Sequence, residues 1–294
     1  MSHRYSNLER PGLNERELVE ALCAPRGPFS RLELVNETGS TNTDLVAHAL
    51  EGREVWPDLS VLTAEMQTAG RGRLERTWTA PERSSIIVSV LLRPANADQI
   101  PVPTRSYSWL SLLAALSLVD AVRDRAQVPA TIKWPNDVQV DDRKLAGLLA
   151  QMVHSPDGTP PAVVVGAGVN VCLTDDELPV TSATSLLLEY ATTTDRNILL
   201  KAYLRALARN YRSFCDVGGD AFTPWPDGTS LAAKIAAVMN TIGEHVRAEL
   251  PGGEQVVGYA TGLDRDGCLQ IRDNQNVMHT VSAGDVVHLR RTGP

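Results

Sequence analysis

The chain has 294 residues, of which 43% are hydrophobic, and it carries a formal net charge of −7. This length predicts one large domain plus a small one, and the apolar content excludes a disordered chain. The acidic balance excludes a broadly basic nucleic-acid surface, because duplex binding depends on neutralising phosphates. Four widely spaced cysteines, no apolar run of membrane-spanning length and no secretory leader favour a cytoplasmic protein with free thiols.

Residues 1–30 form an N-terminal extension with several prolines and glycines. We expect one short helix within it, residues 14–22, because Asn14 is a good N-cap and Glu17 follows three residues later. A winged helix-turn-helix domain would need roughly twice this length. The segment therefore predicts no DNA-binding domain.

A strand is expected at residues 32–35 and a helix at residues 45–50. Ser40 or Thr41 can cap this helix, and Asp44 suits its first turn. The same helix N-terminus could present free N–H groups to an anion. Taken alone, the segment favours simple capping.

The segment Gly-Arg-Gly-Arg-Leu-Glu-Arg-Thr-Trp at residues 70–78 lies between two expected strands, 59–65 and 85–92. Glycine lets backbone amides approach a bound group, and the arginine fork fits carboxylate or phosphate. A Gly-Arg run can also be a plain solvated loop. Its place between two buried strands favours a mobile loop that closes over an anionic, partly aromatic ligand, such as a nucleotide or an acid that a nucleotide activates.

Residues 107–126 predict a long core helix, and residues 131–140 and 144–153 predict two strands joined at Asp141 and Asp142. The first strand contains Lys-Trp-Pro-Asn-Asp at 133–137, which is unusual because each of these residues costs packing or ladder bonds. An edge strand with a bulge is the alternative. With a two-residue turn, Lys144 pairs with Gln139 and shares a face with Asp137, which brings an ammonium and a carboxylate together.

A further strand at residues 160–165 leads into Gly-Ala-Gly-Val-Asn at 166–170. This run lacks the third glycine of a dinucleotide fingerprint. Its glycines instead suggest close approach of the backbone to a ligand or a neighbouring strand, and Asn170 could bind a polar group. Residues 195–214 predict a second long helix capped by Asp195.

After residue 240, short segments separated by turns predict a small β-barrel of about 50 residues. The expected strands are residues 241–250, 255–262, 268–272 and 278–289. The six histidines are scattered and none has metal-ligand spacing, so no protein metal site is expected.

Taken in order, these segments resemble biotin protein ligases, the biotin–acetyl-CoA-carboxylase ligases. The matching motifs are Gly-Ser-Thr-Asn at 39–42, Gln67, the 70–78 segment, 133–137, Lys-Leu-Ala-Gly at 144–147, and 166–170. The resemblance covers about residues 32–290 and implies an α+β fold. That fold comprises a class II tRNA-synthetase-like catalytic domain (residues 31–240) with a mixed, largely antiparallel sheet, and a C-terminal SH3-like barrel (residues 241–294).

The resemblance also implies a reaction in two steps. Biotin and ATP, with Mg²⁺, give biotinyl-5′-AMP, and a lysine of a biotin carboxyl carrier protein then takes the biotin. DNA and membranes are not expected among the partners. Arg71, Arg73 and Lys144 can offset the repulsion between carboxylate and phosphate. A closed loop protects the reactive anhydride from water, and Asp137 is a candidate acceptor for the lysine proton.

The resemblance assigns roles to individual residues of this sequence. Contacts to the biotin ring fall on Ser40, Thr41, Asn42 and Gln67. The loop that closes on biotin and the adenylate comprises Gly70, Arg71, Gly72 and Arg73. Lys144 matches the lysine that contacts the biotin carboxylate and the α-phosphate. Nucleotide contacts fall on Arg73, Arg76, Trp78, Lys133, Asn136, Lys144 and Asn170. The expected catalytic residues are Arg71, Arg73, Lys144 and Asp137.

Two departures from the family pattern stand out. Glu75 occupies a position where the family usually has glycine, and it could pair with Arg73 or Arg76 or stiffen the loop. The N-terminal DNA-binding domain of bifunctional members is missing.

Three other functions are alternatives to biotin ligation. A lipoate or octanoyl ligase of related fold fits the 70–73 and 133–137 motifs less well. A biotin-responsive DNA repressor is opposed by the acidic balance and the short N-terminal segment. A biotin-binding module without catalysis predicts that no adenylate forms.

Overall fold

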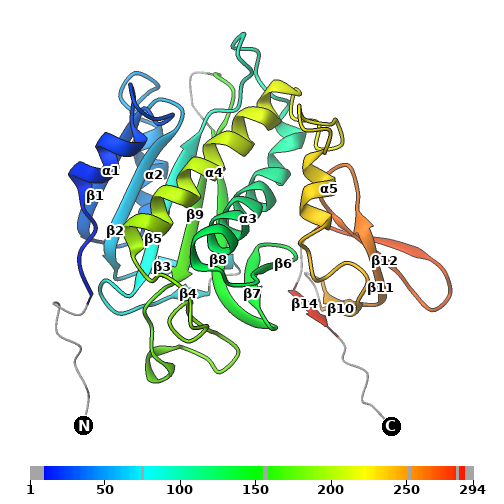
Figure 1. Cartoon of the computed structure of the whole chain (residues 1–294). Coiled ribbons are helices and arrows are strands. Elements are labelled where there is room, and N and C mark those ends of the chain that lie inside the picture. Colours follow the sequence, from blue (N-terminus) through cyan, green and yellow to red (C-terminus); the bar gives the residue numbers. More distant parts are fainter. Residues whose placement is uncertain (1–9, 74–75, 155–157, 251–252, 283–284, 289–294) are drawn as a thin grey trace.

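The computed structural model describes residues 10–73, 76–154, 158–250, 253–282 and 285–288. A seven-stranded sheet forms the centre of the molecule, and a five-stranded sheet lies to one side of it (Figure 1). No helix in the described ranges is long and apolar enough to cross a membrane.

The large sheet has the strand order β1-β2-β5-β9-β8-β7-β6. β1 and β2 run parallel, and the other neighbouring pairs are antiparallel. The expected mixed, largely antiparallel sheet is therefore confirmed. Its strands are β1 (Arg31–Thr38), β2 (Ser60–Gln67), β5 (Ser85–Leu92), β6 (Thr131–Lys133), β7 (Asp137–Val140), β8 (Arg143–Val153) and β9 (Ala162–Asn170).

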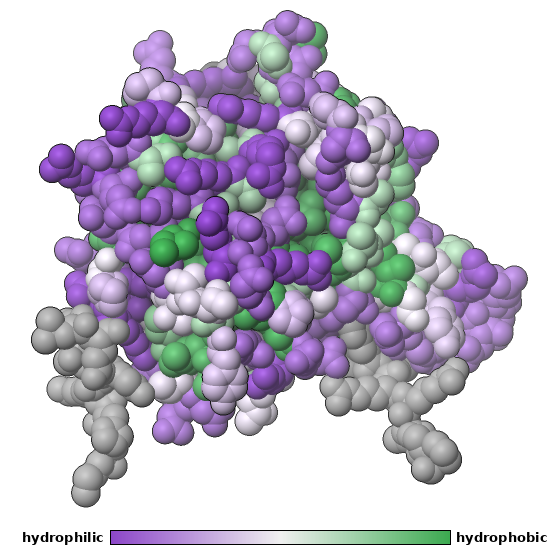
Figure 2. All heavy atoms as spheres, viewed as in Figure 1, coloured by the Kyte–Doolittle hydropathy of each residue, from purple (hydrophilic) through white to green (hydrophobic). Residues whose placement is uncertain are grey.

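Helices cover both faces of this sheet (Figure 1). Side chains alternate between the faces: Val163 and Val165 of β9 pack into the larger core cluster, and Val164 packs into the smaller one. The larger cluster contains residues of α1 (Glu15–Leu22), α3 (Trp109–Ala121) and α4 (Arg196–Asp216), and the smaller contains residues of α2 (Thr41–Ala49). Figure 2 shows that the outer surface on the α3 and α4 side is mostly hydrophilic.

The predicted helix starts are confirmed by side-chain caps. Asn14 accepts from the Glu17 N–H at 3.1 Å, and Asp195 accepts from the Asn197 N–H at 2.8 Å. Ser40, not Thr41, is the N-cap of α2. The long helix expected at 107–126 is α3 with a 3₁₀ turn before it (Thr104–Ser108) and a π turn after it (Val122–Ala126).

The single strand expected at 131–140 is wrong. The chain turns back at Trp134, Pro135 and Asn136, so β6 and β7 pair with each other as antiparallel strands. Pro135 has no N–H for a ladder, and the Trp134 N–H donates to Thr241 Oγ1 at 3.0 Å instead of to a strand. The Asn136 side chain donates to the Leu148 carbonyl, which holds the turn over β8.

The hairpin between β7 and β8 is confirmed, with the predicted register next to the turn and a one-residue shift between Val138 and Gln139. Asp141 and Asp142 have φ values of 46° and 64°, as a two-residue type I′ turn requires. Gln139 pairs with Lys144. By contrast, the expectation that residues 166–170 come after a strand is wrong, because these residues lie within β9 itself.

The small sheet is antiparallel, with the order β13-β12-β11-β10-β14. The single strand expected at 278–289 is wrong within the described residues, since β13 (Met278–Val281) and β14 (Asp285–His288) lie on opposite edges. Indole N–H groups of the large domain anchor this sheet: Trp109 donates to the Arg265 carbonyl at 2.9 Å and Trp134 to the Gly267 carbonyl at 3.1 Å. The other strands are β10 (His245–Glu249), β11 (Gln255–Leu263) and β12 (Leu269–Arg272), and a short helix, α5 (Leu231–Ala236), precedes them.

Candidate active site

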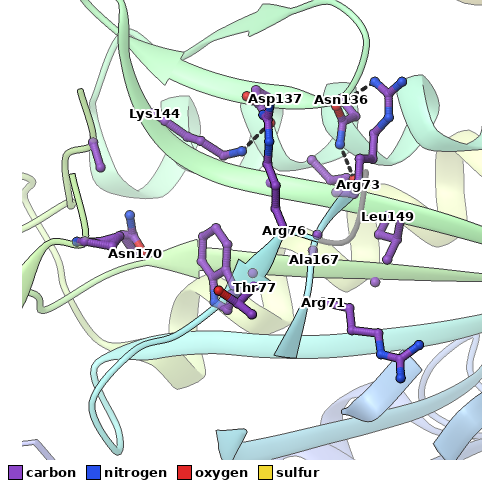
Figure 3. Close-up of a pocket in the computed structure, with 18 of the residues that line it drawn as sticks. Arg71, Arg73, Arg76, Thr77, Asn136, Asp137, Lys144, Leu149, Ala167 and Asn170 are labelled. Atoms are coloured by element: carbon purple, nitrogen blue, oxygen red, sulfur yellow. Dashed lines mark hydrogen bonds and ion pairs between the residues drawn. The ribbon is translucent and has the colours of Figure 1, made fainter. Parts of the chain in front are cut away.

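A cavity of about 880 Å³ opens between the N-terminus of α2, the β3–β4 hairpin and the β7–β8 hairpin, with β9 as its floor. Figure 3 shows part of its lining. Every predicted site residue except Gly70 contributes to this lining. Segments far apart in the chain therefore meet at one place, as the sequence motifs predicted.

The floor of the cavity depends on two glycines. A Cβ on Gly168 would lie 2.5 Å from Trp78 Cε2, so the indole packs directly on the bare β9 backbone. A Cβ on Gly166 would lie 2.1 Å from Asn42 Oδ1. The glycine run does permit a close approach, but the groups that approach are two side chains, those of Trp78 and Asn42, and not the ligand or neighbouring strand that was expected.

The Gly-Arg segment forms a short hairpin of β3 (Gly70–Arg71) and β4 (Thr77–Trp78). Gly70 is required by space, because a Cβ there would lie 2.4 Å from the Trp78 carbonyl oxygen. The Gly72 N–H donates to the Arg76 carbonyl at 2.6 Å and closes the turn. Glu75, the departure from the family pattern, lies outside the described residues.

Arg73 reaches across the cavity to the 134–136 turn (Figure 3). Its Nη1 donates to Asn136 Oδ1 at 3.3 Å. Asn136 is fixed in turn by two hydrogen bonds with Leu148. The Asn136 side-chain amide donates to the Leu148 carbonyl, and the Leu148 N–H donates to the Asn136 carbonyl at 3.0 Å. Arg71 extends away from Arg73 in this view.

Lys144 and Asp137 form an ion pair, with Nζ and Oδ1 2.7 Å apart (Figure 3). The predicted juxtaposition of ammonium and carboxylate is thus present. The backbone of Lys144 is also held on its other side, since its N–H donates to the Ser182 carbonyl at 2.8 Å and its carbonyl accepts from the Thr184 N–H at 2.9 Å. Lys144 is therefore positioned by a strand on one side and by the 182–184 segment on the other.

The N-terminus of α2 meets the end of β2 at the opposite end of the cavity. Gln67 Oε1 accepts from the Thr41 N–H at 2.8 Å and from Thr41 Oγ1 at 3.1 Å. Ser40 caps the helix through the Thr43 N–H. Both bonds engage the oxygen of the Gln67 carboxamide. The hydrogen-bond donors of this side chain are on its amide nitrogen, which these two bonds do not use.

Of the predicted nucleotide residues, Asn170 is buried and its Nδ2 donates to the Thr184 carbonyl at 2.9 Å. Lys133, at the end of β6, also lines the cavity. The lining carries five cationic side chains (Arg71, Arg73, Arg76, Lys133 and Lys144) and two carboxylates (Asp137 and Asp142). In a chain of net charge −7, this local excess of positive charge suits a polyanionic ligand.

Three contributors to the site escaped the sequence reasoning. Residues 179–180 and 182–183 form one wall, Val286 of the small sheet completes another, and Ser89 and Gln151 support Asn42 from behind. Only Ser89 carried a local signal, as a polar residue inside the apolar run 85–92. The others are brought in by long-range packing.

Fold and cavity together define the class: a protein with a central mixed sheet, a cationic cavity at one end of that sheet and a small antiparallel C-terminal sheet. The model of the biotin/lipoate A/B protein ligase family matches residues 35–170, and the model of the biotin protein ligase C-terminal domain matches residues 241–289. The chain belongs to the biotin/lipoate A/B protein ligase family.

Named relatives agree with this assignment. The chain is 41% identical over 287 residues to a biotin–[acetyl-CoA-carboxylase] ligase of Mycobacterium tuberculosis, covering 96% of this chain and 97% of that one. It is 29% identical to the bifunctional ligase/repressor BirA of Bacillus subtilis, covering 95% and 81%. The biotin protein ligase of Aquifex aeolicus in complex with biotin and ATP has the same fold, with a TM-score of 0.66, 24% identity and coverage of 89% and 100%.

Proposed function

We propose that this chain is an ATP-dependent biotin ligase that makes biotinyl-5′-AMP and transfers the biotin to a lysine of a biotin carboxyl carrier domain. One observation carries the proposal: the sequence motifs converge on a single cationic cavity that contains the Lys144–Asp137 ion pair. The family includes lipoate ligases, so the choice of biotin rests on the M. tuberculosis relative and on the biotin-ligase-type C-terminal domain.

In the first step, a biotin carboxylate oxygen attacks the α-phosphorus of ATP. The bond from that phosphorus to the bridging oxygen breaks, and pyrophosphate leaves. Two anions must approach each other, so the barrier is partly electrostatic. Arg71, Arg73 and Lys144 are proposed to lower it, because fixed cations in a partly desolvated cavity stabilise developing charge strongly.

In the second step, the ε-amine of the carrier lysine attacks the acyl carbon of the mixed anhydride. The amide bond forms, AMP leaves, and the amine loses a proton. Asp137 is proposed to accept or orient this proton. Its ion pair with Lys144 keeps the carboxylate in the cavity lining, and this supports that role.

Mg²⁺ belongs to the proposal as a companion of ATP. Mg²⁺ in nucleotide sites is usually held by one or two carboxylates together with substrate phosphates. Asp142 in the lining would supply such a carboxylate, whereas the carboxylate of Asp137 is paired with Lys144. When bound, the ion would neutralise charge on the leaving pyrophosphate.

The remaining parts of the proposal concern context. We infer a cytoplasmic location and a division between catalytic and C-terminal domains at residues 240 and 241, which the separate sheets and the 241–289 match support. DNA is left out of the partners because the net charge of −7 weighs against phosphate neutralisation.

The test is ATP–pyrophosphate exchange with biotin or lipoate, followed by transfer to a carrier domain. We expect exchange that depends on biotin and not on lipoate, and labelling of one carrier lysine. Lys144→Ala should abolish exchange while circular dichroism shows a retained fold. Exchange driven by lipoate alone would reject the proposal, and normal exchange by Lys144→Ala would reject the role of that residue.

A further inference from the structure

The carboxamide of Asn42 has nearly all its hydrogen-bonding capacity engaged within the protein. Its Nδ2 donates one hydrogen to the Leu149 carbonyl at 3.1 Å and the other to Gln151 Oε1 at 3.0 Å. Its Oδ1 accepts from Ser89 Oγ at 2.6 Å. An amide nitrogen has only two hydrogens, so Asn42 has no donor left for a ligand.

The partners of Asn42 lie in one row across the sheet. Ser89 of β5 pairs with Gly166 of β9, and Gly166 pairs with Leu149 of β8. Gln151 lies two residues beyond Leu149, on the same face. Gly166 contributes no side chain, and the carboxamide of Asn42 fills the space that a Cβ would take.

Neither Ser89 nor Gln151 contributes to the cavity lining that the described residues form, whereas Asn42 does. Ser89 is fully buried. Among the described residues, Gln151 can therefore reach a ligand in the cavity only through Asn42. Ser89 can do so through Asn42 or through Thr41, whose Oγ1 lies 2.8 Å from Ser89 Oγ.

We propose that Ser89 and Gln151 are positioning residues for biotin binding, which act by fixing the Asn42 carboxamide on the sheet. This proposal rests on the function proposed above. Asn42 is then an anchor for the first turn of α2, the turn that carries the Thr41 N–H and the Ser40 cap to the end of the cavity where Gln67 lies. Asn42 itself gives the ligand little direct binding, in contrast to the role that the family resemblance assigns to it.

The chemistry of the Gln151 contact makes the idea testable. Asn42 needs an acceptor at position 151, and a glutamate supplies a strong one, whereas the thioether of a methionine of similar size is only a weak one. Leaving one buried amide hydrogen without an acceptor lowers the equilibrium constant for the ordered Asn42 position by about tenfold. We therefore expect Gln151→Met to raise the KM for biotin about tenfold, with the KM for ATP and kcat within about twofold of the original.

The full chain is assayed by biotin-dependent pyrophosphate exchange, with biotin Kd by calorimetry and thermal unfolding of each variant. Gln151→Glu should restore the KM for biotin, and Ser89→Ala should resemble Gln151→Met. The matched control is Met152→Gln, which alters the next side chain on the same strand, exposed to 45%, and should change nothing. In an Asn42→Ala background, Gln151→Met should add less than a twofold effect, because its only route is already removed.

An unchanged KM for biotin in both Gln151→Met and Ser89→Ala, with an active parent enzyme, overturns the inference and leaves the proposed function standing. A multiplicative effect in the Asn42→Ala background also overturns it. So does a loss shared equally by biotin and ATP without rescue by Gln151→Glu, since that marks a general structural role. A parent enzyme without biotin-dependent exchange rejects the proposed function and the inference together.

Discussion

Gly168 makes room for Trp78, and this pair sets the depth of the cavity floor. The indole packs on the β9 backbone, and its Nε1 is buried without a hydrogen-bond partner among the described residues. Trp78 also passes close to Gly147, where a Cβ would lie 3.6 Å from its Cζ3. The position of the ring thus depends on the lack of side chains beneath it.

Gly168→Ala should displace the Trp78 ring, because the new Cβ would lie 2.5 Å from it, closer than real contacts permit. We expect kcat/KM in pyrophosphate exchange to fall by at least about tenfold, roughly 1.4 kcal/mol. Gly262→Ala is the control, since a Cβ there meets nothing within 4 Å. Equal activity of the two variants would show that the ring position is unimportant.

Asp137→Asn should separate the two half-reactions. Exchange should survive within about tenfold, while single-turnover transfer from preformed adenylate to a carrier lysine slows about a hundredfold, as loss of a general base does. Raising the pH should recover transfer, because the lysine amine then loses its proton to solvent. Equal slowing of exchange and transfer at every pH would place Asp137 in the first step instead.

At the scale of elements, a buried ion pair joins α4 to the strand that ends at the site. Arg196 Nη1 donates to Glu65 Oε2 at 2.7 Å, and both side chains are almost fully buried. Glu65 lies two residues before Gln67 and also accepts from the Leu13 N–H at 2.5 Å. Arg196 Nη2 donates to the Pro11 carbonyl at 2.8 Å. The Arg196–Glu65 ion pair therefore holds the N-terminal segment, β2 and α4 together.

Arg196→Met should destabilise the fold by about 3–5 kcal/mol, because it leaves the Glu65 carboxylate buried and unpaired. Denaturant unfolding at pH 7 measures this. The comparison is Arg209→Met, which removes an exposed contact with Asp120 at 3.8 Å and should cost less than about 1 kcal/mol. If Arg196→Met also costs less than about 1 kcal/mol, water must reach the Glu65 carboxylate readily.

Local signals in the sequence predicted the elements whose causes are themselves local. The caps of α1, α2 and α4 depend on side chains within three residues, and the Asp141–Asp142 turn fixes its own register. The fold-back at residues 134–136 was not predictable in this way, because it depends on bonds to Leu148 and Thr241. The split of residues 278–289 depends likewise on pairing with β12 at one edge and β10 at the other.

The candidate site was predictable as a set of residues and not as a geometry. Its motifs indicated which side chains meet, and the Lys144–Asp137 pair followed from the hairpin register. The contacts that support these side chains were not predictable, because the contacting residues are far apart in the sequence. The glycines of β9 did not indicate that the Asn42 and Trp78 side chains pack on the strand at Gly166 and Gly168. The proposed roles of these residues stay predictions until the variants are measured.

At the scale of the whole molecule, Asp58 links the loop before β2 to α4 and to the end of β5. Its Oδ1 accepts from the Arg93 N–H at 2.7 Å and from Tyr211 Oη at 3.0 Å. Burial, the largest influence, raises the pKa of this carboxyl above its usual value. The folded state therefore binds this proton more tightly than the unfolded state does.

The sign of the pH effect follows from that difference. The protonated Asp58 carboxyl stabilises the folded chain relative to the charged form. This contribution is fully present below the pKa of about 3.9 that an aspartate has in the unfolded chain, and it is lost as the pH rises through the higher pKa of the folded chain. Asp58→Asn keeps an acceptor without the buried charge, so its stability relative to the original chain should increase from pH 4 to pH 7. Urea unfolding across that range measures it, and a constant difference would contradict the assignment.

Val286 of β14 lines the same cavity as Ser40, although the two lie near opposite ends of the described chain. During synthesis the ribosome releases the α2 end of the site first and the β14 wall last. A growing chain that already holds Lys144 and the three arginines Arg71, Arg73 and Arg76 still lacks this wall. The lining of the cavity is therefore complete only after the small sheet has folded against the large domain.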